Sequence, residues 1–181
     1  MVDIKIVSTV LKFAQICPLV IGMGFMAHFT KEFHDFTTQL YASIDSSLDP
    51  YDNGSFGRYE FYLFSVGVGI GIAVLGLICA LRGLMEKKYG ALSMTALQAL
   101  WAFHLLVATS LLAKSLSTYE KKAYEGGTMS LCKMWDQSEG YKDYDFNCSQ
   151  IYGAVVCGFI AMALFAMDTV MSMVAFNRAQ L

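Results

Sequence analysis

Four long apolar stretches with very few charged side chains constrain this chain more than any other feature. They lie at about residues 6–29, 59–83, 90–115 and 150–177. A bilayer core about 30 Å thick is crossed by roughly 20 apolar helical residues, so each stretch is long enough to span it. The apolar runs are continuous rather than alternating, which excludes a transmembrane β-barrel. The sequence therefore predicts an all-α membrane protein, a bundle of four transmembrane helices that forms a single domain over residues 1–181.

The composition supports a membrane location. Of the 181 residues, 56% are hydrophobic and only 15% are charged, which is more apolar surface than a soluble chain of this length can bury. The net charge of −2 gives no support to nucleic-acid binding. The partners that we expect are membrane lipids and other membrane proteins, in a homo-oligomer or a larger channel or receptor complex. The expected location is the plasma membrane or a secretory or vesicle membrane.

The positive-inside rule predicts that both termini are cytoplasmic. Four spans place the two termini and the short loop after the second span on one side of the membrane. Basic residues outnumber acidic ones in these short segments, which contain Lys5, Lys12, Arg82, Lys87, Lys88 and Arg178 against Asp3 and Glu86. The outer loops are then about 30–58 and 116–149. The segment before the first span has no small-residue cleavage site, so we expect this span to be a retained signal-anchor.

The second outer loop contains a pair of cysteines, Cys132 and Cys148. A pair exposed to the oxidising secretory lumen is expected to form a disulfide. Closing a loop of this size stabilises the fold by about 3 kcal/mol in the chain-entropy model. The outer loops also contain two N-glycosylation sequons, at Asn53 and Asn147, which agree with the predicted orientation.

Aromatic residues are concentrated in the segment that this disulfide would close. They are Trp135, Tyr141, Tyr144 and Phe146. One interpretation is a contact surface for another protein, because aromatic residues dominate such surfaces. The other is a position at the membrane interface, where Trp and Tyr are enriched.

Polar residues within the spans are costly in a bilayer and each needs an explanation. Asp168 continues a stripe of mostly small residues, Ala154, Gly158, Ala161 and Phe165, which predicts close helix packing and an inward-facing carboxylate. His104 of the third span is predicted to lie about 20 Å from the cytoplasmic end of its helix and Asp168 about 14 Å from the end of its own. Gln15 lies at a depth similar to that of Asp168.

Two interpretations of His104, Asp168 and Gln15 remain. The favoured one is a polar clasp that determines which helices are neighbours. The other is a proton or cation pathway, which usually requires more than one acid and a broken helix or an internal repeat. The second span also contains a G-x-x-x-G motif, Gly67 and Gly71, which predicts close packing within the molecule or, alternatively, dimerisation.

Sequence motifs for common enzyme chemistry are absent from the 181 residues. The chain contains no phosphate-binding G-x-x-x-x-G-K-[ST], no zinc-binding H-E-x-x-H and no G-x-S-x-G nucleophile motif. The segments predicted to be cytoplasmic are too short to form a domain. We therefore expect no catalytic residues, no metal ligands, no cofactor and no enzymatic activity.

The layout resembles the MARVEL-domain tetraspan proteins, a superfamily that includes synaptophysin- and occludin-like proteins. The resemblance rests on four spans, cytoplasmic termini, a short inner loop, the cysteine pair of the second outer loop and the small and aromatic residues of the final span, Tyr152–Phe165. It implies a non-enzymatic organiser of membranes or protein assemblies, in vesicle trafficking, membrane apposition or cell junctions. The alternatives are a small auxiliary subunit beside an ion channel or receptor, and an ion-conducting protein that uses Asp168 and His104.

Overall fold

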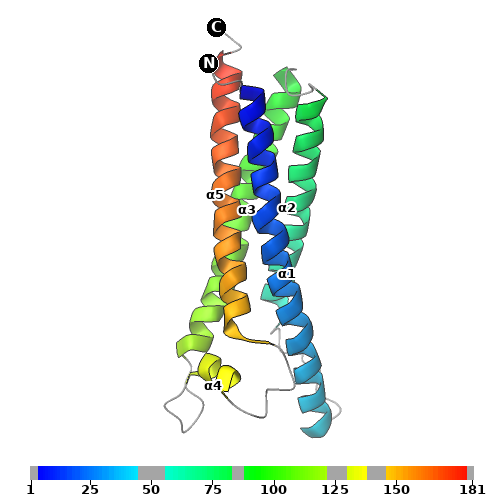
Figure 1. Cartoon of the computed structure of the whole chain (residues 1–181), viewed down its shortest axis with the longest axis vertical. Helices are drawn as coiled ribbons and strands as arrows, with labels where there is room; N and C mark the ends of the chain where they lie inside the picture. The colour runs from blue at the N-terminus through cyan, green and yellow to red at the C-terminus, as the bar shows by residue number, and fades with distance from the viewer. Residues whose placement is uncertain (1–3, 45–55, 83–87, 122–129, 138–145, 179–181) are drawn as a thin grey trace.

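The chain folds into four long helices and one short one in the computed structural model (Figure 1). The structure describes residues 4–44, 56–82, 88–121, 130–137 and 146–178. The helices are α1 (Ile4–Ile44), α2 (Gly57–Leu81), α3 (Lys88–Lys121), α4 (Leu131–Gln137) and α5 (Cys148–Arg178). The four long helices are each long and apolar enough to span a membrane. The predicted all-α fold with four membrane spans is confirmed.

The long helices form one bundle in which both chain ends lie at the same end (Figure 1). Its main contacts are between α1 and α2, α2 and α3, α3 and α5, and α5 and α1, so each long helix packs against two neighbours. The short helix α4 lies at the opposite end of the bundle, beside the start of α5 (Figure 1). Helix α4 was not predicted from the sequence.

Helix α1 continues well past the predicted end of the first span at residue 29. Its 41 residues extend about 60 Å, roughly twice the thickness of a bilayer core. The hydropathy falls after Thr30, but the helix continues because Phe33 and Phe36 lie one turn apart and pack on the hydrophobic core. The segment predicted as the first outer loop therefore begins as helix rather than as irregular chain.

Small residues allow α5 to pack closely, and large apolar side chains cover the outside of the bundle. Small residues face inward on α5, where Ala154, Gly158 and Ala161 are all buried. Large apolar side chains cover the outside, among them Ile6, Phe13, Val20, Phe64, Leu75, Leu100, Phe103, Ile160 and Val170. An exposed apolar surface of this extent, on four helices long enough to span a bilayer, is stable within a membrane, against lipid or other transmembrane helices. The protein is a multi-pass integral membrane protein.

The glycines that allow close helix packing are not those of the G-x-x-x-G motif. Among the described residues, no atom from another helix lies within 4 Å of a Cβ built on Gly67 or Gly71, so the predicted packing of this motif within the molecule is wrong. Gly69 instead lies against the Trp101 ring, and Gly76 against the side chain of Lys12. The reason is geometric. Gly69 and Gly76 are seven residues, or about two turns, apart, so both lie on the inner face of α2. Gly67 and Gly71 are each two residues from Gly69 along the chain, which places both on the opposite side of the helix.

Alanine substitutions are expected to separate these two classes of glycine. Gly69→Ala places a methyl carbon 3.0 Å from Nε1 of Trp101, whose N–H already donates to the carbonyl of Ser65 at 3.1 Å. Overpacking of this kind costs about 1–3 kcal/mol, or roughly 2–4 °C in Tm for each kcal/mol. Gly71→Ala meets open space and gains helix propensity, so its Tm should be unchanged or higher. Thermal unfolding of both variants in detergent tests this, and equal losses at the two sites would contradict it.

Candidate functional site

A buried ion pair joins the first and last spans. Lys12 of α1 and Asp168 of α5 are both fully buried, and the Lys12 ammonium group donates to Oδ2 of Asp168. An unpaired charge at this depth in a membrane would be strongly disfavoured. The pair carries no net charge, so each residue allows the other to be buried.

Gln15 completes the connection between α1 and α5. Its Nε2 donates to Oδ2 of Asp168 at 3.1 Å and to the backbone carbonyl of Leu164 at 3.3 Å. Two side chains of α1, one turn apart, therefore bind the same carboxylate oxygen. Hydrogen bonds between transmembrane helices specify which helices are neighbours and in what register.

The absence of a side chain at Gly76 leaves room for Lys12. A Cβ at this position of α2 would lie 2.8 Å from Cε and 3.1 Å from Nζ of Lys12. The lysine therefore lies across the backbone of α2 while its ammonium group reaches α5. We call Lys12, Gln15, Gly76 and Asp168 the polar layer.

Lys12 was misassigned from the sequence, where it was counted among the cytoplasmic basic residues. Its burial removes one positive charge from that count, although the basic excess of these short segments remains. The spacing of buried residues along α1 could have predicted that Lys12 faces inward. Lys12 begins the stripe of buried residues on α1 that continues, at spacings of three and four, through Gln15, Leu19, Gly22, Met26 and Phe29.

The prediction that His104 lies beside Asp168 is wrong. Its ring stacks on Trp101, with the centroids 4.6 Å apart, and lies 5.1 Å from the ring of Phe61. The inward face of α3 follows Leu105 rather than His104, and one residue along a helix turns the side chain by about 100°. The imidazole therefore packs between aromatic rings at the contact of α2 and α3.

Eight aromatic residues fill the end of the bundle opposite the chain termini. All four long helices, or residues immediately before them, contribute to this aromatic cap, as does α4. Ring centroids of contacting pairs are 5.2–6.4 Å apart, the range of favourable edge-on and offset contacts. The cap comprises Phe29, Phe33, Phe36, Phe56, Tyr59, Tyr119, Trp135 and Phe146.

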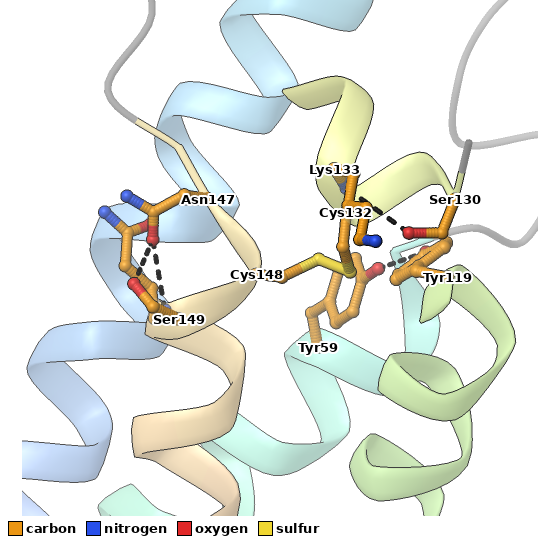
Figure 2. The surroundings of a disulfide bond; sticks show 9 residues. Tyr59, Tyr119, Ser130, Cys132, Lys133, Asn147, Cys148 and Ser149 are labelled. Carbon is orange, nitrogen blue, oxygen red and sulfur yellow. Dashed lines mark hydrogen bonds between the residues drawn. A yellow bond between two sulfur atoms is a disulfide. The ribbon is translucent and has the colours of Figure 1, made fainter. Parts of the chain in front are cut away.

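The disulfide fastens the loop side of this cap. Cys132 of α4 and Cys148 at the start of α5 are bonded, with their Cα atoms 5.5 Å apart, as the sequence predicts (Figure 2). Beside it, the hydroxyl groups of Tyr59 and Tyr119 are hydrogen-bonded to each other (Figure 2). The disulfide thus holds α4, and with it Trp135, against the ends of the long helices.

The loop aromatics divide into two groups. Trp135 and Phe146 pack into the cap, with their ring centroids 5.4 Å apart, and Trp135 remains partly exposed. The predicted contact residues Tyr141 and Tyr144 lie outside the described residues. The glycosylation candidate Asn53 lies outside them as well.

Asn147, the second glycosylation candidate, precedes the first residue of α5. Its Oδ1 accepts hydrogen bonds from the backbone N–H of Gln150 at 3.3 Å and from the Ser149 hydroxyl (Figure 2). This is the geometry of a helix N-cap. N-glycosylation uses the amide nitrogen, so the capping oxygen and the attachment atom of Asn147 are different.

The contacts of the polar layer and the cap hold helices of the bundle together. Within the described ranges, no three His, Cys, Asp or Glu side chains form a group that could hold a metal ion. The charged groups of the polar layer are paired with each other, and the cap is built from rings and a disulfide. Both features connect α1 to distant parts of the chain.

Comparison with known proteins identifies the family. Residues 5–171 match the model of the MARVEL membrane-associating domain, a range that includes the first three spans and all but the last three residues of the fourth. No curated protein and no solved structure gives a significant match. The resemblance expected from the sequence is confirmed, and the chain belongs to the MARVEL family.

Proposed function

We propose that this protein is a non-enzymatic organiser of membranes or of protein assemblies, acting in vesicle trafficking, membrane apposition or a cell junction. The observation that supports this most is the match to a membrane-associating domain over residues 5–171. The matched range includes the polar layer, the aromatic cap, three whole spans and most of the fourth, so the proposed role belongs to the bundle as a whole.

The surface chemistry of the bundle agrees with this role. Large apolar side chains are exposed along all four spans, for example Phe13, Phe64, Phe103 and Val170. Such a surface contacts lipid or the transmembrane helices of other proteins. The proposal includes cytoplasmic termini, supported by the basic excess of the short segments, and epitope tags tested before and after permeabilisation check this orientation.

Localisation and self-association measured in the same cells test the proposal. A tagged chain should be enriched in vesicle or junction membranes, and a membrane-permeant crosslinker should capture copies of the chain with each other. An unrelated four-span protein of similar size, with the same tag and expression level, is the control. An even distribution over cell membranes, identical to that of the control, would contradict an organising role.

Two further measurements separate the alternatives. A larger membrane protein that co-purifies at fixed stoichiometry in mild detergent would favour an auxiliary subunit. Ion flux in reconstituted liposomes that disappears in Asp168→Asn would favour conduction through the bundle. We expect neither result, because the Asp168 carboxylate is already paired with Lys12 and bound by Gln15.

A further inference from the structure

We propose that the polar layer binds an internal water molecule that links α3 to the ion pair between α1 and α5. The starting observation is a set of four buried polar atoms, on three side chains, with no hydrogen-bond partner among the described residues. They are Oδ1 of Asp168, Oε1 of Gln15, and both Oε1 and Nε2 of Gln98. All three side chains are fully buried.

The packing of α3 on α5 places Gln98 at the level of the ion pair. Thr109 of α3 meets Gly158 of α5, where a Cβ would lie 2.5 Å from the threonine Oγ1. The two helices are antiparallel, as consecutive spans in the chain. Counting eleven residues from this contact toward the chain termini leads to Gln98 on α3 and to Thr169, the neighbour of Asp168, on α5. Eleven residues are just over three full turns, so Gln98 lies on the same face as Thr109.

The unpartnered atoms match the hydrogen-bonding capacity of water. Three of them are acceptors, on Asp168, Gln15 and Gln98, and the fourth is the amide donor of Gln98. A water molecule donates two hydrogen bonds and accepts at least one, so one molecule can serve the Gln98 amide and two of the oxygens. Buried waters typically make about three such bonds to polar groups that have no protein partner.

Water fits this layer better than a cation. Lys12 already supplies the positive charge that neutralises Asp168, and a second cation beside its ammonium group would be repelled. The Gln98 amide N–H groups also require an acceptor, which a cation does not provide. Through one water molecule, Gln98 of α3 is therefore joined to the side chains of α1 and α5 in the polar layer.

The substitution Gln98→Met tests the proposal by the sign of its effect on thermal stability. Methionine has nearly the same shape as glutamine but removes both unpartnered atoms of residue 98. If a water is bound, the substitution removes its partners, and the Tm of the full chain in detergent should fall by roughly 2–4 °C or more. If the layer is dry, the substitution removes two unsatisfied atoms, and the Tm should rise, which would overturn the proposal.

Leu105→Met is the matched control, because Leu105 is fully buried on the same face of α3 but carries no polar atom. The fall for Gln98→Met must exceed the change in this control; an equal change would overturn the proposal. The Tm should be the same in sodium, potassium and choline chloride at equal ionic strength. A rise with one metal cation would assign the layer to that cation instead.

A direct measurement distinguishes a bound water from a hydrogen bond between Gln98 and Asp168. The side-chain amide signals of ¹⁵N-glutamine-labelled protein in micelles can be assigned to Gln98 by their loss in Gln98→Met. We expect a nuclear Overhauser effect between these amide protons and a long-lived water. Its absence would overturn the proposal, even if Gln98→Met lowers the Tm.

Discussion

Replacing Asp168 by alanine is expected to destabilise the bundle by about 3–5 kcal/mol. The substitution leaves the Lys12 ammonium group buried with no counter-charge, at a position where it is fully enclosed. It also removes one of the two hydrogen bonds of the Gln15 amide. Denaturation in mixed micelles with increasing SDS measures the loss as a free energy of unfolding, and Lys12→Ala should give a loss of similar size.

The double variant Lys12→Met with Asp168→Leu is the control for this prediction. Replacement of a whole buried ion pair by apolar residues is often neutral or stabilising, so the double variant should recover most of the lost stability. A thermodynamic cycle of the single and double variants then gives the coupling between the two residues. Single variants as stable as the unmodified chain, or losses that simply add, would show that the pair does not hold α1 to α5.

Removal of the disulfide is expected to lower the stability of the aromatic cap by about 3 kcal/mol while the spans remain folded. The bond closes a loop with a sequence separation of 16 residues and holds α4 against the bundle end. The variant with Cys132→Ser and Cys148→Ser therefore should lose cap structure at a lower denaturant concentration than the unmodified chain.

The two tryptophans allow the two regions to be observed separately. Trp135 lies in the cap, and Trp101 lies at the contact of α2 and α3. In a Trp101→Phe background the fluorescence of Trp135 should report the earlier cap transition, whereas in a Trp135→Phe background Trp101 should change little. Cys17→Ser, at an exposed free cysteine of α1, is the control. Coincident shifts of both tryptophans would contradict a local role for the disulfide.

The fold class could be predicted from the sequence because a bilayer imposes one strong rule. Long apolar runs must become helices, and few charges within them leave little ambiguity. The disulfide could also be predicted, because both cysteines lie in one loop that was predicted to face the oxidising secretory lumen. The end of α1 at Ile44 and the short helix α4 could not be predicted in this way, because both depend on contacts of Phe33, Phe36 and Trp135 with distant parts of the chain.

The partners of the polar residues were harder to predict than their burial. Asp168 was placed inward by the small residues of its stripe, but its partner depends on the packing order of the helices. His104 was matched to Asp168 by its depth in the third span, but its rotation about the α3 axis directs it toward Phe61. Lys12 lies on the inward stripe of α1, but its burial was not predicted. Basic residues near the end of a span usually extend to the membrane interface, and Lys12 was assigned there.

The unbroken length of α1 has a mechanical consequence. Near its beginning Lys12 is bound to Asp168, and 21 residues later, about 32 Å along the same helix, Phe33 is packed against Trp135 and Phe146. A piston-like slide of α1, or a turn about its own axis, would break the ion pair and withdraw the ring at the same time. Helix α1 is therefore fixed at two separate levels, by the ion pair at Lys12 and by the aromatic cap at Phe33, and these contacts hold the other helices in register with it.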